Sequence, residues 1–159
     1  MFRISALPVS RFSHLFGKSD EDLRALGVIA SLVDGPGSPC RVSMRDAKAG
    51  ERVLLMNHQH QDADTPFRAS HAIYVIDGAR EARLEPGETP EVMRSRLLSV
   101  RAFSRNGMMI DADVVDGSRA SEVFERMLEN KEAAYLHGHY AKFGCYAARV
   151  DRVPGFPET

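Results

Sequence analysis

The strongest constraint on the fold is an Asn-Gly pair between two alternating apolar runs. The runs are "LLSVRAFS", which starts at residue 97, and "MMIDADVV", which starts at residue 108, and Asn106 and Gly107 lie between them. Asn-Gly favours the tight turns whose twist matches that of two paired strands. This stretch therefore predicts an antiparallel hairpin, a pairing that needs no crossover helix.

Further strands are predicted from short runs that are β-branched and apolar, or that alternate between apolar and polar residues. These runs are "FRISAL", "VIASLV" over 28–33, "CRVSM" after Pro39, "RVLLMNHQ", "HAIYVI", "AAYLHGHY" and "FGCYAARV". We predict that "VIASLV" is buried and that "CRVSM" lies at a sheet edge. The polar stretch "HQDADTPFRAS" predicts a long loop, which is a common location for functional residues.

Three short helices are predicted beside these strands. "SDEDLRALG" has Ser19 as its N-cap and Gly27 at its C-terminal end, which specifies both ends of a helix. "PEVMRSR" begins with a proline, which suits the first helical position. "SRASEVFERMLEN" carries an apolar stripe at helical spacing, which predicts a helix that faces the core. The members of this stripe are Val123, Phe124, Met127 and Leu128.

Hairpins joined without helical crossovers predict an α+β protein. We expect a mainly antiparallel sheet with about three short helices on one face or end. A β-barrel-like fold with helical plugs is the alternative, because the same strand pattern fits an open sheet and a sheet closed into a barrel. A chain of 159 residues suits one domain. We predict this domain over residues 1–151 and a C-terminal tail over residues 152–159.

Composition excludes several classes of protein. The 21 Lys and Arg residues and the 22 Asp and Glu residues give a formal charge of -1, which lacks the basic excess typical of nucleic-acid binding. No apolar run has the length of a membrane span or the pattern of a signal peptide. Cys40 and Cys145 are too few for a secreted disulfide scaffold. We therefore predict a soluble cytoplasmic protein with reduced thiols and without nucleic-acid or membrane partners.

The main chemical question concerns "YLHGHYAKFGCY", which starts at Tyr135. On a strand, His137 and His139 point to the same side as Tyr135. If the turn has three residues, Cys145 lies opposite His139 on that side. If the turn has two or four residues, Cys145 faces away, because a slip of one residue inverts the face. Only the first register gathers two imidazoles and a thiol.

A cluster of His137, His139 and Cys145 suits zinc, although a chain of this length needs no cofactor for stability. The chain contains neither Cys-x-x-Cys nor His-Glu-x-x-His, so hydrogen-bonded structural histidines are the commoner interpretation. A thiol beside an imidazole also suits nucleophilic or acid-base chemistry. His60, His139 and Cys145 are therefore the candidate catalytic residues, and the alternative for each cysteine is simple core packing.

Arginines form a further candidate group. Arg41, Arg68 and Arg101 lie at strand or loop positions that can converge with the histidines. A guanidinium binds a carboxylate or phosphate through two parallel hydrogen bonds. Together with His137, these arginines are candidate ligand-binding residues for a small anionic molecule. The alternative is that each arginine extends into solvent or pairs with a nearby acid such as Asp111.

Three ordered blocks carry a resemblance to a known family. They are "PCRVSMRDAKAGERVLLMNHQHQDADTPFRAS", "LLSVRAFSRNGMMIDADVVDG" and "YLHGHYAKFGCYAARVD". Together they resemble the small bacterial domain-of-unknown-function family 1203 over most of the chain. The resemblance implies motif positions at Cys40, Arg41, His60, Arg68, Arg101, Asp111, His137, His139, Gly144 and Cys145. It implies no catalytic residue or cofactor, because the family is named for lacking an assigned activity. The chain departs from the family pattern ahead of "HAIYV" and at Tyr140.

Two functions from different classes remain open. The first is the binding of a small anionic ligand in a pocket lined by His60, Arg68, His137, His139 and Cys145, with acid-base or thiol chemistry. The second is a noncatalytic interaction module, such as a homodimer, in which these side chains form a structural polar network. Convergence around a cavity open to solvent favours the first, and mutual satisfaction inside a closed core favours the second. The sequence does not decide whether the protein is an enzyme.

Overall fold

The computed structural model describes residues 1–155, which form two compact units. The first unit contains Met1–Ser5, Gln61–Ala69 and the chain from Arg83 onward, and the second contains Ala6–His60 and Ser70–Ala82. The single domain over residues 1–151 therefore stays a prediction. The tail over residues 152–159 also stays a prediction, and the last strand extends to Arg152. Residues 156–159 of that tail lie outside the described residues.

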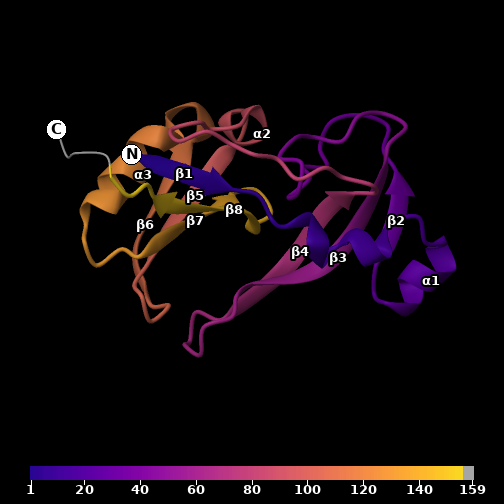
Figure 1. Cartoon of the computed structure of the whole chain (residues 1–159), viewed down its shortest axis with the longest axis horizontal. Coiled ribbons are helices and arrows are strands. Elements are labelled where there is room, and N and C mark those ends of the chain that lie inside the picture. Colours follow the sequence, from indigo (N-terminus) through magenta and orange to yellow (C-terminus); the bar gives the residue numbers. More distant parts are fainter. Residues whose placement is uncertain (156–159) are drawn as a thin grey trace. The chain divides into compact units, whose positions relative to one another are not determined.

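The first unit is built on a five-stranded antiparallel sheet with the order β1-β8-β7-β5-β6 (Figure 1). Its strands are β1 (Phe2–Ser5), β5 (Leu97–Phe103), β6 (Met109–Asp116), β7 (Tyr135–Tyr140) and β8 (Cys145–Arg152). β5 and β6 form the hairpin that Asn106 and Gly107 predict, and this prediction is confirmed. Gly107 has a φ of 79°, which few residues other than glycine and asparagine adopt.

One side of this sheet is apolar and is covered by helices. α3 (Ala120–Glu129) buries the predicted stripe, and the Phe124 ring meets the Phe2 ring edge to face at 5.2 Å. α2 (Glu91–Arg94) brings Met93 over Gly138, where an added Cβ would lie 3.1 Å from the Met93 Cε atom. A short 3-10 helix, η3 (Gly117–Arg119), leads into α3. These contacts place the core of the first unit on the side of the sheet that faces α3.

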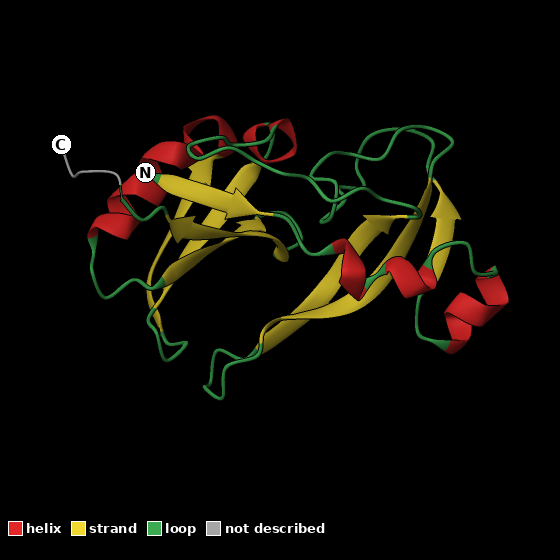
Figure 2. Ribbon diagram, viewed as in Figure 1, coloured by secondary structure: helices red, strands yellow, loops and turns green. Residues whose placement is uncertain are grey.

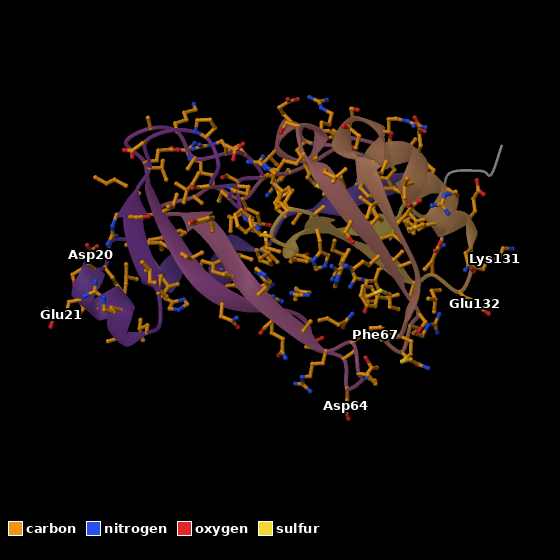
Figure 3. All side chains as sticks on the ribbon, turned by 180° about the vertical axis from the view of Figure 1, so that it is seen from behind. Asp20, Glu21, Asp64, Phe67, Lys131 and Glu132 are labelled. Atoms are coloured by element: carbon orange, nitrogen blue, oxygen red, sulfur yellow. The ribbon has the colours of Figure 1, made fainter. Side chains whose placement is uncertain are left out.

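The second unit is built on a three-stranded sheet with the order β2-β3-β4. Its strands are β2 (Ile29–Leu32), β3 (Arg52–Gln61) and β4 (Ala69–Ile76), and its helices are η1 (Val9–Arg11), η2 (Ser13–Leu15) and α1 (Asp20–Ala25). Ser19 caps α1 as predicted, because its side chain accepts a hydrogen bond from the Asp22 amide at 3.1 Å. Figure 3 shows Asp20 and Glu21 on this first turn of α1, where acidic side chains interact favourably with the positive end of the helix dipole.

The fold class predicted from the hairpins is confirmed. Strands dominate both units and the helices are short, as Figure 2 shows. The pairs β1–β8, β2–β3, β5–β6, β5–β7 and β7–β8 are antiparallel, so the chain is an α+β protein. Within residues 1–155 neither sheet closes on itself, and the barrel-like alternative is wrong. No helix in this part of the chain has the length and apolar character needed to cross a membrane.

Three local predictions in the second unit need correction. β2 is exposed rather than buried, with Ile29 59% and Leu32 70% exposed, because within residues 1–155 β2 lies at an edge of its sheet, beside β3. "CRVSM" is not an edge strand, since Cys40 makes only an isolated bridge to Tyr74 and the chain then turns. The loop before β4 is shorter than expected, because β3 continues to residue 61 and leaves residues 62–68 as the loop.

Candidate functional site

The side of the five-stranded sheet away from α3 carries most of the candidate residues of the first unit. Strand side chains alternate between the two sides, so residues that flank the apolar Val100, Leu136 and Val150 point the other way. We call this side the polar face and define it by Arg101, His137, His139, Tyr146 and Arg149. The sequence places His137 and His139 together by their spacing, and the ring centroids lie 6.2 Å apart.

Strand register aligns Arg149, His137 and Arg101 across three neighbouring strands. His137 on β7 pairs directly with Arg149 on β8 and with Arg101 on β5. Directly opposed side chains on antiparallel strands have Cβ atoms roughly 4.5–5.5 Å apart. We call these three residues the basic row. It places one imidazole between two guanidinium groups and is the most concentrated basic feature of the polar face.

Arg101 is the member of the row with the fewest partners. Its Nε donates a hydrogen bond to the Ser99 hydroxyl at 3.3 Å, and within residues 1–155 it makes no ion pair. Burial lowers the pKa of the Arg101 guanidinium, although arginine stays charged at neutral pH. Burying part of a cation that has no carboxylate partner costs free energy unless an anion binds to it. The acid proposed as its alternative partner, Asp111, instead lies near Arg126 of α3.

Arg149, at the other end of the row, is already neutralised. Its Nε and Nη2 atoms donate to the Asp151 carboxylate, and the closest contact is 2.8 Å. These hydrogen bonds raise the pKa of Arg149. The guanidinium also lies 4.1 Å from the centre of the Tyr135 ring. The charge of Arg149 is therefore balanced within the protein, and the positive charge still to be balanced lies at Arg101.

His137 lies between the two arginines in the register and within a group of aromatic rings. The rings of Phe103, Tyr135 and Tyr146 have their centres 4.9, 5.2 and 5.2 Å from the His137 ring. The side chain is only 4% exposed. These rings hold the imidazole in one orientation and leave little room around it. The imidazole of His137 is therefore almost closed off from solvent.

His139 is fixed by the turn that follows it. Its Nδ1 lies 2.9 Å from the Gly144 carbonyl oxygen, and since a carbonyl only accepts, Nδ1 carries the proton. The Tyr146 ring meets the imidazole edge to face at 5.9 Å. His139 is fully buried. These contacts give His139 a defined tautomer and a structural role in the β7–β8 hairpin.

The register of that hairpin separates Cys145 from the two histidines. Tyr140 pairs with Cys145, so the turn has four residues, 141–144, and Cys145 points to the apolar side with Tyr140. A bulge at Ala147 then restores Tyr146 and Arg149 to the polar face, because Gly138 pairs with Ala148 and His139 with Tyr146. The register that would gather a thiol and two imidazoles is therefore not the one formed.

The same register keeps Cys145 on the opposite side of the sheet from His137 and His139, the three residues named for a metal. Across the described residues, no group of three His, Cys, Asp or Glu side chains is arranged to hold a metal ion. Neither cysteine is in a disulfide, and both are buried. The other cysteine, Cys40, accepts hydrogen bonds through its sulfur from the Ser43 and Ile76 amides at 3.4 and 3.3 Å. Cys40 therefore packs in the core of the second unit and ties two segments together.

Arg41 and His60 also belong to the second unit. Arg41 is buried and donates from Nη1 to the Pro39 carbonyl oxygen. His60 is half-buried on β3, on the same side of the strand as His58. Burial lowers the pKa of His58, and the charges of Arg11 and Arg41 lower it further. Convergence of Arg41 and His60 with the basic row stays a prediction.

Arg68 lies on the loop between β3 and β4, which belongs to the first unit. Figure 3 shows this loop through the labelled Asp64 and Phe67. Thr65 donates from its hydroxyl to the Gly107 carbonyl at 3.1 Å, which ties the loop to the β5–β6 turn. Arg68 itself is exposed, and its side chain makes no hydrogen bond or ion pair with the described residues. The loop is anchored to the β5–β6 turn, whereas the side chain of Arg68 is exposed on it.

Several residues on the same side of the sheet as the polar face were not predicted as site residues from sequence: Ser99, Phe103, Tyr146 and Arg149. Ser99 and Phe103 lie two positions from Arg101, so strand periodicity was a usable signal for them. Tyr146 and Arg149 are three positions apart, and period-two reasoning assigns them to opposite sides. Only the bulge at Ala147 brings them to the same side.

Comparison with known proteins identifies a family but no relative with an assigned activity. A family model described as "Protein of unknown function (DUF1203)" matches residues 37–152. This match covers most of the chain and includes every candidate site residue. No curated protein and no solved structure matches the chain.

Proposed function

Because the chain belongs to the DUF1203 family of proteins of unknown function, we propose a function from its own residues: it binds a small anionic molecule on the polar face. The observation that carries this proposal is Arg101, a half-buried guanidinium with a serine hydroxyl as its hydrogen-bond partner within residues 1–155. Its Nη1 and Nη2 atoms can donate two parallel hydrogen bonds to one anion. His137 lies next to it in the register.

The electrostatics of the polar face support an anion at this position. Arg149 is balanced by Asp151, and Arg101 has no such counter-charge among residues 1–155. A bound carboxylate or phosphate would supply that charge and satisfy the donors of Arg101. The proposal concerns binding. Thiol chemistry by Cys145 gains no support, because this side chain points to the apolar side.

Thermal unfolding with a panel of small anions tests the proposal. A ligand present at about ten times its dissociation constant adds roughly 1.4 kcal/mol of stability, which raises the melting temperature by about 3–6 °C for a domain of this size. We expect at least one small anion to give this shift. The shift should be lost in Arg101→Gln and kept in Arg105→Gln, a control at an exposed turn arginine. A shift that survives Arg101→Gln contradicts the proposal.

The second candidate is a noncatalytic interaction module with a structural polar network. The supporting observation is His139, which is fully buried and is held by the Gly144 carbonyl and the Tyr146 ring. Under this candidate His139→Phe lowers stability, and Arg101→Gln changes neither stability nor the response to anions. Size-exclusion chromatography coupled to light scattering tests the associated homodimer. A monomer at all concentrations removes the homodimer.

We also propose a cytoplasmic location. Its support is the presence of two buried cysteines outside any disulfide, as is usual in reducing compartments. The formal charge of -1 gives no reason to expect a nucleic-acid partner. Fractionation of cells that express a tagged chain tests the location, and recovery in an oxidising compartment contradicts it.

A further inference from the structure

We infer that the anion is a small carboxylic acid with an oxygen on the neighbouring carbon, a 2-hydroxy or 2-oxo acid. This inference rests on the anion site proposed above and adds the chemical class of its ligand. Arg101 would hold the carboxylate, and His137 would contact the second oxygen. The argument has three parts: the charge at Arg101, the position of His137, and the size limit set by the surrounding rings.

The charge on the polar face matches a carboxylate better than a phosphate. Arg149 is paired with Asp151, so Arg101 supplies the one guanidinium charge of the row that the described residues leave unbalanced. A carboxylate carries one negative charge and two oxygens that match the planar guanidinium. A phosphate monoester carries between one and two charges near neutral pH, and its second charge would find no unbalanced partner in the row.

The orientation of Arg101 leaves its two terminal nitrogen atoms available for paired hydrogen bonds to a carboxylate. The Nε atom is engaged by Ser99 at 3.3 Å, which holds the guanidinium along the strand. Nη1 and Nη2 then remain for the ligand. The Ser99 hydroxyl also lies opposite His139 in the register, so the base of the arginine is fixed between two strands. A guanidinium positioned in this way recognises a carboxylate with defined geometry.

His137 is placed to contact a substituent next to that carboxylate. It is the direct cross-strand partner of Arg101, with Cβ atoms roughly 4.5–5.5 Å apart. Histidine is shorter than arginine, so its imidazole lies deeper in the row, which agrees with its exposure of 4%. An imidazole can donate a hydrogen bond from a ring nitrogen, and therefore suits a hydroxyl or an oxo group.

The aromatic rings limit the ligand to a short carbon chain. Phe103, Tyr135 and Tyr146 surround His137 with ring centres within 5.2 Å. A single oxygen on the carbon next to the carboxylate needs less room in this group than a carbon chain does. A longer or branched substituent at that carbon would have to displace them, which is costly in a packed region.

Calorimetric titration with four matched anions tests the inference: propionate, lactate, pyruvate and inorganic phosphate. Propionate and lactate differ only in the 2-hydroxyl group. We expect lactate or pyruvate to bind about tenfold more tightly than propionate, which corresponds to one well-formed hydrogen bond. His137→Phe, which keeps an aromatic ring at this position, should remove this preference, so that lactate and propionate bind equally. Arg105→Gln serves as the control and should change nothing.

The outcomes separate the ligand class from the proposed function. Equal binding of propionate and lactate, lost in Arg101→Gln, overturns the 2-oxygen class and leaves anion binding intact. Tighter binding of phosphate than of any carboxylate also overturns the class. Absence of binding by all four anions overturns both. If His137→Phe does not fold, the imidazole NMR signals of His137 in the native chain decide: they must shift with lactate and not with propionate.

Discussion

Replacing Gly107 with alanine tests how the loop between β3 and β4 is held against the β5–β6 turn. Gly107 has a φ of 79°, and a Cβ atom added there would lie 2.3 Å from the Ala63 Cβ atom. Real Cβ atoms do not approach so closely, so the loop must move. This loop carries Arg68, and Thr65 bonds it to the Gly107 carbonyl. The substitution therefore perturbs the backbone conformation and the anchored loop together.

The expected destabilisation combines two terms. An alanine in the left-handed region costs roughly 1–2 kcal/mol relative to the right-handed region. Forcing an extra methyl group into a packed contact costs a further 1–3 kcal/mol. Gly107→Ala should therefore lower the free energy of unfolding by about 2–5 kcal/mol. Gly144→Ala is the matched control, because Gly144 has a φ of 76° and nothing lies within 4 Å of an added Cβ.

Urea unfolding of three variants separates these terms. Gly144→Ala should lose only the conformational term of about 1–2 kcal/mol. Gly107→Ala should lose more, and adding Ala63→Gly to it should recover the contact term. The reasoning is refuted if Gly107→Ala costs no more than Gly144→Ala, or if Ala63→Gly recovers nothing in the double variant.

Two further predictions concern the individual units. In the second unit, the hydrogen bond from Arg45, followed by that from the Lys48 amide, lowers the pKa of Glu51 from 4.5 to about 2. Because the folded pKa is depressed, the stability that this pair contributes is complete above about pH 4.5 and is lost as the pH falls toward 2. Carboxyl NMR titration should show that the pKa of Glu51 rises in Arg45→Gln. An unchanged pKa contradicts this prediction. In the first unit, Phe124→Ala should cost about 3–5 kcal/mol in urea unfolding because its ring is buried against Phe2, whereas Phe143→Ala, at a side chain 81% exposed, should change stability by less than about 0.5 kcal/mol.

Local sequence signals predicted most of the elements of the first unit. Asn106 and Gly107 specify a hairpin by themselves, because the turn conformation depends on those two residues. The stripe of α3 specifies its buried side through spacing alone. Neither signal needs information from distant parts of the chain. This explains why the β5–β6 hairpin and α3 were predicted correctly, together with the antiparallel class.

The polar face could be predicted only in part, because it depends on register between strands. The spacing of His137 and His139 places them on one side whatever the partner strand does. The position of Cys145 depends on the turn length, and the alignment of Arg149 with His137 depends on the bulge at Ala147. Both are set by how β7 and β8 pair as a whole. One strand by itself does not encode them.

The burial of β2 was mispredicted, because the tertiary arrangement overrides its local composition. β2 has the apolar character of an inner strand, yet it lies at the edge of its sheet and leaves Leu32 exposed. Arg41, in contrast, is a charged residue that lies in the interior of the second unit and bonds the Pro39 carbonyl. Residue type sets a preference for burial, and strand order decides the outcome.

An NMR measurement of contacts between bound ligand and protein tests the central claim most directly. Lactate labelled with ¹³C is titrated into the native chain, and magnetisation transfer from its methyl protons is recorded. We predict transfer to the ring protons of His137 and to the side-chain protons of Arg101. Transfer only to residues outside the polar face, with neither of these two affected, would contradict the claim.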